Sequence, residues 1–251
     1  MSVSVSVRDC VAHVRLDRGD QGNPIDLALA RSLLEAARRC QADDVRAVLL
    51  TAAGRSFCVG GDLREFAAAP DLRAHLLEVT DALHDALRIF TTLDAPVVAA
   101  VHGAVAGAGL GLVGVADIAV AAEDATFVAA YTGIGYSPDA GVTWSLPRLV
   151  GPATALDLLL TNRRLTAAEA QAAGLVSRVT ADAPGVAADL AARLAGGATG
   201  AFGATKRLVR RSASFDDQLD AEAEALAGAA VSPDGREGVR AFLAKRPPRY
   251  R

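Results

Sequence analysis

The feature that most constrains the fold is a stretch of small and apolar residues near the middle of the chain, PVVAAVHGAVAGAGLG, from Pro96 to Gly111. Its first part, Pro96 to Val101, is an uninterrupted apolar run, which predicts a fully buried strand. From Gly103 onward it contains only Gly, Ala, Val and Leu, so the backbone can approach a ligand or another backbone closely. Any chemistry in this second part must therefore come from main-chain N–H groups.

A helix that begins at Ala108 or Gly109 would leave its first N–H groups without acceptors inside the helix. Such groups attract a carbonyl oxygen that is gaining negative charge. A tight strand-to-helix turn with close packing explains the same residues without any chemistry. This stretch alone leaves both interpretations open.

Composition narrows the class of protein. A chain of 251 residues with 51% hydrophobic but only 4% aromatic residues predicts one large domain with an aliphatic, small-residue core. The net charge of −3 argues against a nucleic-acid partner. The three cysteines show neither metal-ligand spacing nor a disulfide framework, which suits a reducing cytosol. The apolar stretch from Ala95 to Ala122 is too interrupted for a membrane span, and the N-terminus has no signal-peptide pattern.

Hydrophobic periodicity predicts strands and helices together over about the first 180 residues, and helices alone after Ala183. The expected strands cover residues 3–7, 11–16, 46–51, 96–101, 118–122 and 175–179. The expected long helices cover residues 26–40, 71–93, 142–150 and 152–161. Asp26 is the expected cap of the first helix, and Thr166 and Glu169 have the spacing of a capping box.

Five motifs in order resemble the crotonase, or enoyl-CoA hydratase/isomerase, superfamily. They are FCVGGDLRE from Phe57, APVVAAVHGAVAGAGLG from Ala95, ADIAVAAEDATF from Ala116, LPRLVG from Leu146 and AAGLVSRV from Ala172. The resemblance implies an α/β fold, with a spiral of repeated ββα units and the active site in residues 1–185 and a helical trimerisation region in residues 186–251. It also implies an acyl-CoA thioester substrate, no cofactor because coenzyme A is part of that substrate, and a homotrimer or a hexamer of paired trimers.

The same resemblance assigns an oxyanion hole to the backbone N–H groups of Gly61 and Ala108. These donors would stabilise the enolate-like charge on the thioester oxygen, and losing one such donor costs other enzymes about 3 kcal/mol. The residues around them would contact the substrate, and these are Asp62, Leu63, Arg64 and Gly107.

The two glutamates that hydratases of this superfamily use are missing. Gly111 stands at the first of these positions and Tyr131 at the second. Hydration needs one group to activate water and another to protonate the α-carbon, and a tyrosine is a poor substitute for a carboxylate base. Restoring Gly111→Glu alone is therefore expected to raise hydration only weakly.

One acid remains in the right region, Asp139 in the segment SPDAG. Isomerases of the superfamily resemble this segment, and 4-chlorobenzoyl-CoA dehalogenases place their nucleophilic Asp here, although they have Trp where this chain has Tyr131. Asp139 could instead simply cap the following helix. An apolar pocket destabilises the charged form of a carboxylate, which suits a base that removes and returns a proton.

Several further residues are candidates for contacts with the substrate. Tyr131 and Tyr136 are candidates for lining the acyl pocket, with packing as the alternative. Candidate contacts to the coenzyme A phosphates are Arg18, Arg64, Lys206, Lys245 and Arg246. We expect His102 to be structural, and because the other three histidines form no cluster, we expect no metal site.

Together these patterns predict an acyl-CoA isomerase that shifts a double bond through an enolate, with Asp139 carrying the proton. Three alternatives stay open. They are an enoyl-CoA hydratase, a dehalogenase or hydrolase in which Asp139 attacks the acyl group, and a non-catalytic acyl-CoA-binding paralogue.

Overall fold

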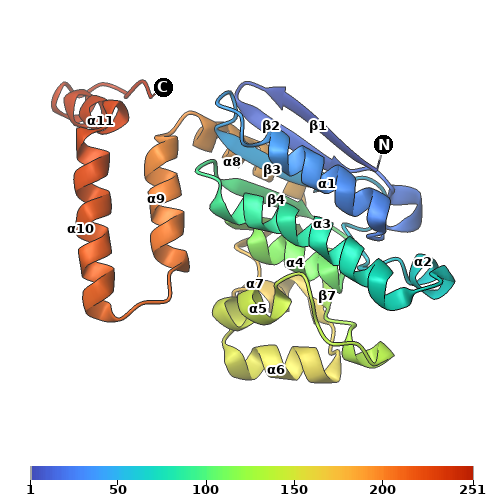
Figure 1. Ribbon diagram of the computed structural model, residues 1–251. Helices are drawn as coiled ribbons and strands as arrows, with labels where there is room; N and C mark the ends of the chain where they lie inside the picture. The colour runs from blue at the N-terminus through green and yellow to red at the C-terminus, as the bar shows by residue number, and fades with distance from the viewer. Residues whose placement is uncertain (1, 251) are drawn as a thin grey trace.

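The computed structural model describes residues 2–250, and its centre is a six-stranded sheet (Figure 1). In spatial order its strands are β1 (Val3–Arg8), β2 (Val11–Leu16), β3 (Ala47–Ala52), β4 (Val97–Val101), β6 (Ile118–Ala122) and β9 (Arg178–Thr180). β1 and β2 form an antiparallel hairpin, whereas every other neighbouring pair is parallel. A second sheet of three short strands consists of β5 (Ala104–Ala106), β7 (Thr126–Val128) and β8 (Leu165–Thr166).

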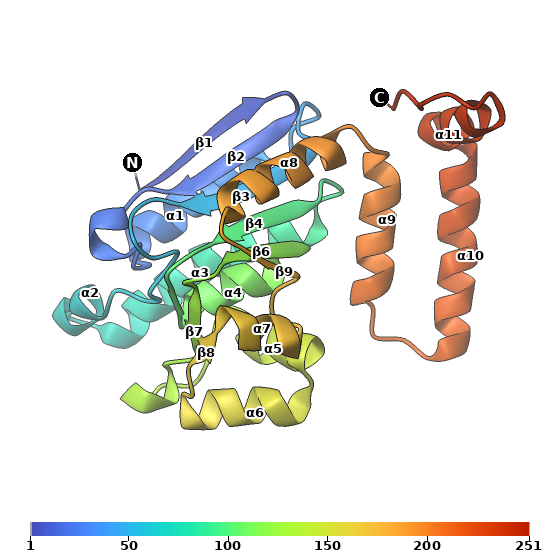
Figure 2. The same ribbon diagram turned by 180° about the vertical axis from the view of Figure 1, so that it is seen from behind.

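Helices cover both faces of the large sheet, which explains why its middle strand has no polar residue. α1 (Leu27–Arg39) and α3 (Leu72–Thr92) lie on one face, and α8 (Ala183–Ala195) lies on the other (Figures 1 and 2). In β4, Val97, Ala99 and Val101 belong to the hydrophobic cluster beneath α1 and α3. Val98 and Ala100 belong to the cluster beneath α8. A strand buried on both sides reads as a continuous apolar run, as the sequence predicts here.

Four shorter helices surround the second sheet. They are α4 (Ala108–Val115), α5 (Val142–Val150), α6 (Pro152–Thr161) and α7 (Ala167–Ala173). The predicted capping box is present, because the hydroxyl of Thr166 accepts the N–H of Glu169 and the Glu169 side chain accepts the N–H of Thr166. A short α2 (Leu63–Ala68) precedes α3.

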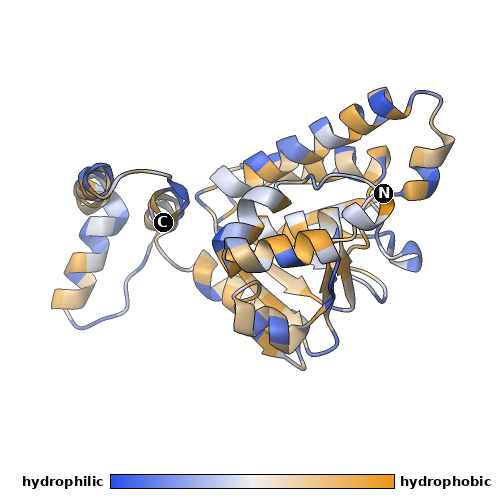
Figure 3. Ribbon diagram, turned by 90° about the horizontal axis from the view of Figure 1, so that it is seen from below, coloured by the Kyte–Doolittle hydropathy of each residue, from blue (hydrophilic) through white to orange (hydrophobic). Residues whose placement is uncertain are grey.

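The last three helices extend away from the sheets (Figures 1 and 2). They are α9 (Thr199–Arg210), α10 (Phe215–Val231) and α11 (Pro233–Leu243). Two buried or half-buried cations on α9 tie it to the core, since Lys206 and Arg210 contact the Asp117 carboxylate at 2.8 and 2.9 Å. α10 and α11 expose large apolar side chains, including Phe215 (76%) and Phe242 (82%). Figure 3 shows these helices apart from the sheets, with polar and apolar residues mixed along α11.

Most predicted elements are confirmed with ends within one or two residues, but one predicted strand is wrong in position. The strand expected over residues 175–179 is observed at Arg178–Thr180. Gly174 ends α7 in the left-handed conformation, and the N–H of Leu175 donates to the carbonyl oxygen of Ala170 at 2.8 Å. Leu175 is therefore part of the turn that ends α7 and not of the strand. The resemblance implies a boundary between the spiral core and the helical region at residues 185 and 186. This position falls inside α8, which packs on the sheet. Within residues 2–250, no helix has both the length and the apolar composition that crossing a bilayer requires.

Candidate active site

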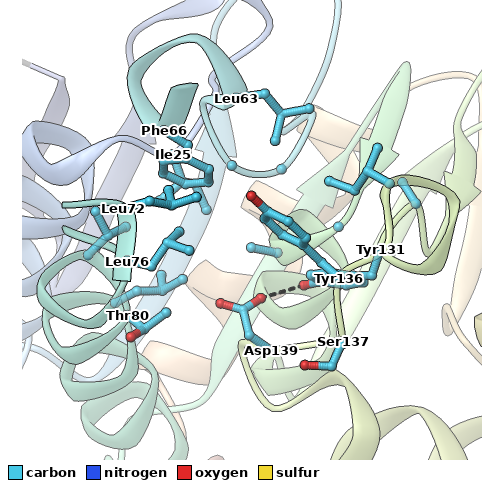
Figure 4. A pocket seen from close by; sticks show the side chains of 18 of the residues that line it. Ile25, Leu63, Phe66, Leu72, Leu76, Thr80, Tyr131, Tyr136, Ser137 and Asp139 are labelled. Carbon is cyan, nitrogen blue, oxygen red and sulfur yellow. Dashed lines mark hydrogen bonds between the residues drawn. The ribbon is translucent and has the colours of Figure 1, made fainter. Parts of the chain in front are cut away.

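A pocket of about 670 Å³ lies between α3, α2 and the loop that follows β7 (Figure 4). Its walls are largely apolar, and α3 supplies much of them through Leu72, Leu76, Leu77, Val79 and Leu83. The structure brings most of the predicted site residues to this pocket, namely Gly61, Leu63, Gly107, Ala108, Tyr131, Tyr136 and Asp139. Asp139 is the only carboxylate among the residues that line it.

Two glycine-containing loops meet at the floor of the pocket. The first loop pairs with β5, because Cys58 donates to Ala104 at 3.3 Å and accepts from the N–H of Ala106 at 2.9 Å. Beyond this pairing, a Cβ added to Gly60 would lie 3.4 Å from the Cα of Gly107, and both glycines have positive φ (93° and 52°). Only glycine adopts both conformations without strain, so these residues let the two backbones run in contact.

The N–H groups predicted to form the oxyanion hole lie just beyond this contact. Ala108 is the first residue of α4, so its N–H has no acceptor within the helix. Among residues 2–250, neither this N–H nor that of Gly61 donates to another group of the chain. A Cβ on Gly61 would lie 2.5 Å from the Phe66 ring, so packing requires glycine there. Both N–H groups are therefore available to a ligand in the pocket.

Asp139 faces the same space, across the pocket from Leu76 and Thr80 (Figure 4). The hydroxyl of Tyr131 donates to its Oδ1 at 2.7 Å. Burial, followed by the negative charge of Asp139, raises the pKa of Tyr131 well above its ordinary value. Tyr131 therefore stays protonated and acts as a donor to the carboxylate. Within the described residues, Oδ2 of Asp139 has no protein partner and is open to the pocket.

The alternative role of Asp139 as a helix cap is wrong. The N-cap of α5 is Gly141, and within the described residues no side chain accepts an N–H of the first turn of this helix. Only the backbone carbonyl of Asp139 contributes there, by accepting the N–H of Val142 at 3.0 Å. The carboxylate is directed into the pocket instead.

Sequence reasoning missed His84, one of the three histidines that form no cluster in the sequence. Its Nε2 accepts the N–H of Ala140, the residue after Asp139, at 3.3 Å. The only signal in the sequence was its position on α3, one helical turn beyond Thr80 and beside Leu83, both of which line the pocket. His102 is structural, as expected, since its Nε2 lies 3.0 Å from the carbonyl oxygen of Gly54.

Asp62 supports the site and does not line it. Its carboxylate caps α2 by accepting the N–H groups of Arg64 and Glu65, and it pairs with Arg18 at 3.4 Å. Arg18 also pairs with Asp26, the N-cap of α1. Asp26, Asp62 and Glu65 are close enough to ligate a metal ion, but the guanidinium of Arg18 already supplies positive charge to two of these carboxylates.

The other candidate cations are scattered. Arg18, Lys206 and Arg246 are engaged with carboxylates of the same chain. Arg64 is exposed on α2 near the pocket, whereas Lys245 follows α11 at the opposite end of the molecule (Figures 1 and 2). Within one chain, the structure does not bring Lys245 to the site.

Comparison with known proteins matches residues 6–251 to the family model described as enoyl-CoA hydratase/isomerase. The chain belongs to this family. It is 38% identical to a probable enoyl-CoA hydratase of Rhodobacter capsulatus, over 99% of this chain and 97% of the relative. It is 37% identical to 1,2-epoxyphenylacetyl-CoA isomerase of Escherichia coli, over 96% of this chain and 94% of the relative.

A solved structure described as a putative enoyl-CoA hydratase/isomerase from Mycobacterium abscessus superposes with a TM-score of 0.92. It is 39% identical in sequence, and the match covers 99% of both chains. The crotonase resemblance and the α/β fold that it implies are therefore confirmed. Members of this family act on acyl-CoA thioesters, and relatives this similar are described as hydratases and as isomerases. The distinction between the two reactions must come from the site itself.

Proposed function

We propose that this member of the enoyl-CoA hydratase/isomerase family is an acyl-CoA isomerase that shifts a carbon–carbon double bond through an enolate. The observation that carries the proposal is the pairing of one carboxylate with two free N–H groups in an apolar pocket. Asp139 has one oxygen fixed by Tyr131 and the other open to the pocket. The N–H groups of Gly61 and Ala108 have no protein acceptor among residues 2–250.

The chemistry follows from this arrangement. Oδ2 of Asp139 takes a proton from C2 of a 3-enoyl thioester, and the electron pair of the broken C–H bond delocalises onto the thioester oxygen. The two N–H groups stabilise that developing charge, a type of contribution worth about 3 kcal/mol for each donor. Asp139 then returns the proton to C4, which leaves the double bond between C2 and C3. One carboxylate suffices, because the same group removes and returns the proton.

Hydration is the weaker proposal because water activation needs a second base near the first. Tyr131 is held in its protonated form and already donates to Asp139. Gly111 offers no side chain at all. Among the residues lining the pocket there is no imidazole and no carboxylate besides Asp139.

Product analysis tests the proposal directly. A 3-enoyl-CoA incubated with the protein in deuterated water should give the 2-enoyl-CoA, with deuterium at C4 unless the proton transfer is wholly internal. Accumulation of 3-hydroxyacyl-CoA would indicate a hydratase. Halide release from a 4-halobenzoyl-CoA, with a mass adduct on Asp139, would indicate attack by the carboxylate. Tight binding of all these esters without turnover would indicate a non-catalytic acyl-CoA-binding protein.

We also propose that the chain assembles as a homotrimer, alone or paired into a hexamer, through residues of the C-terminal helical region. Leu226 (73% exposed) on α10 and Phe242 (82%) on α11 support this, because monomeric proteins rarely leave several large apolar side chains exposed together. Any contact between Lys245 and the coenzyme A moiety would then have to come from a neighbouring copy. Sedimentation at micromolar protein concentration tests the assembly, and a monomer would contradict it.

A further inference from the structure

The turn that carries Asp139 rests directly on α4, at the position of Gly111. A Cβ placed on Gly111 would lie 2.6 Å from the Cβ of Ala140 and closer still to its carbonyl oxygen. Real Cβ atoms essentially never come within 3.0 Å of another heavy atom, and the obstacle here includes backbone. The methyl group of Ala140 therefore occupies the space that a side chain at position 111 would need.

The conformation of this turn is strained, so something must hold it. Ala140 has φ of 52° and Gly141 has φ of 71°, and the left-handed region is unfavourable for alanine. Ala140 is also almost fully buried, with 1% of its surface exposed. A buried N–H without an acceptor is costly, and His84 Nε2 provides that acceptor from α3. The turn is thus held by packing of Ala140 against Gly111 of α4 and by one hydrogen bond from its backbone to His84 of α3.

We propose that Gly111 and His84 are positioning residues that seat the Asp139 turn, and that a side chain at position 111 is incompatible with this seat. The proposal rests on the proposed function, in which Asp139 carries the proton. The claim that these two residues position the turn depends only on the contacts of Ala140 and not on the catalytic role of Asp139. Under this proposal, Gly111 is more than the loss of a hydratase glutamate. The position must be glycine because a side chain there would displace the turn that carries Asp139.

The expectation that Gly111→Glu would raise hydration weakly is therefore revised. A glutamate there would have to displace Ala140, and with it the carboxylate that it was meant to assist. The structure favours loss of the existing activity without gain of the new one. In this chain, the observed position of the Asp139 turn and a side chain at position 111 exclude each other.

A matched pair of variants tests the role of Gly111. Gly111→Ala and Gly200→Ala add the same methyl group to a helical glycine, but a Cβ at Gly200 on α9 would meet no heavy atom within 4 Å. Three quantities are measured. They are amide hydrogen exchange in residues 137–143, kcat with a 3-enoyl-CoA, and the Kd for the unreactive saturated ester butyryl-CoA.

Gly111→Ala should speed exchange in this segment at least tenfold and lower kcat by about tenfold to a hundredfold, since small misplacements of a catalytic group have effects of this size. The Kd for butyryl-CoA should stay within threefold of the native value, and Gly200→Ala should leave all three quantities near native. Native exchange in Gly111→Ala would overturn the proposal. Exchange is measured without turnover, so it tests the positioning role separately from the proposed function. If the native protein has no isomerase activity but the variants show this exchange pattern, the proposed function is refuted and the positioning role of Gly111 is not.

A second pair decides the matter even if Gly111→Ala does not fold. His84→Gln keeps an oxygen that can accept the N–H of Ala140, whereas His84→Leu has a similar volume and no acceptor. Leaving this donor unpaired should lower kcat of His84→Leu by about tenfold or more and speed exchange in residues 137–143. His84→Gln should recover to within threefold of native. If the two variants behave alike, the hydrogen bond does not seat the turn.

Discussion

Replacing Asp139 with asparagine removes the one carboxylate of the pocket at almost constant size. The amide oxygen of Asn can still accept the hydroxyl of Tyr131, which donates to Oδ1 at 2.7 Å in the native chain. The backbone carbonyl of residue 139 continues to accept the N–H of Val142. The variant should therefore fold normally and lose only the group that accepts a proton.

The expected size of the effect follows from what remains in the pocket. No second carboxylate and no imidazole lines it, and the raised pKa of Tyr131 keeps that side chain from acting as a base. The full contribution of a positioned acid or base should then be lost, about 10² to 10⁴ in kcat. At about 1.4 kcal/mol for each factor of ten, this corresponds to about 3 to 5 kcal/mol of transition-state stabilisation.

The assay compares native and Asp139→Asn proteins for conversion of a 3-enoyl-CoA to the 2-enoyl-CoA, together with the Kd for butyryl-CoA. The Kd should change little, because the oxyanion donors are backbone groups of Gly61 and Ala108 on other loops. A variant that keeps more than half of the native rate would refute the single-acid mechanism. Since Gly141 caps α5, Asp139 would then have no assigned role.

Three other variants probe the same site. Ala108→Pro removes an oxyanion donor at the first position of α4, where proline is tolerated, so kcat should fall about 10² to 10³ while circular dichroism stays native. Tyr131→Phe should lower kcat about tenfold to a hundredfold at unchanged Kd, because a hydrogen bond to a charged group is worth about 1.5 to 3 kcal/mol. The same variant tests a pH effect. The folded-state pKa of Tyr131 is raised above the unfolded value of about 10, so its stabilisation is complete below pH 10 and is lost above it by up to about 1.4 kcal/mol per pH unit. Denaturant titrations at pH 9 and 11 should show a shallower loss in Tyr131→Phe. Phe242→Asp should shift sedimentation towards the monomer while circular dichroism of the monomer stays native, because a charge on the exposed face of α11 opposes its burial between copies.

Local signals in the sequence were enough to predict most elements of the fold. β4 is a continuous apolar run because both of its faces are buried, and α1 and α7 begin at Asp26 and Thr166 because these side chains cap their first turns. The strand expected over residues 175–179 failed because apolar character does not distinguish a strand from a buried turn. Leu175 and Val176 are apolar because they enter the core after α7.

Contacts between residues far apart in the sequence could not be predicted from local sequence patterns. Arg18 and Lys206 were candidates for phosphate binding because an isolated cation in a sequence has no visible partner. Folding gives Arg18 the carboxylates of Asp26 and Asp62, and it gives Lys206 that of Asp117. The bond from Ala140 to His84 spans 56 residues and has no periodic pattern. A resemblance to a family could locate Asp139, but only the three-dimensional structure shows which residues hold it.

The glycine-rich stretch posed a choice between close packing and an oxyanion hole, and in the proposed mechanism the first produces the second. Each of its glycines meets backbone where a Cβ would otherwise stand. The partners are Arg55 for Gly103, Gly60 for Gly107, Cys58 for Gly109 and Ala140 for Gly111. Three of these contacts press β5 and the start of α4 against the loop that carries Gly61, and the fourth presses α4 against the turn of Asp139. The two proposed donors and the acid belong to three separate segments, and at Gly109 and Gly111 the backbones lie closer than a Cβ permits. A methyl group at either glycine would have to move one backbone away from another, which would displace a donor or the acid and would also destabilise the fold.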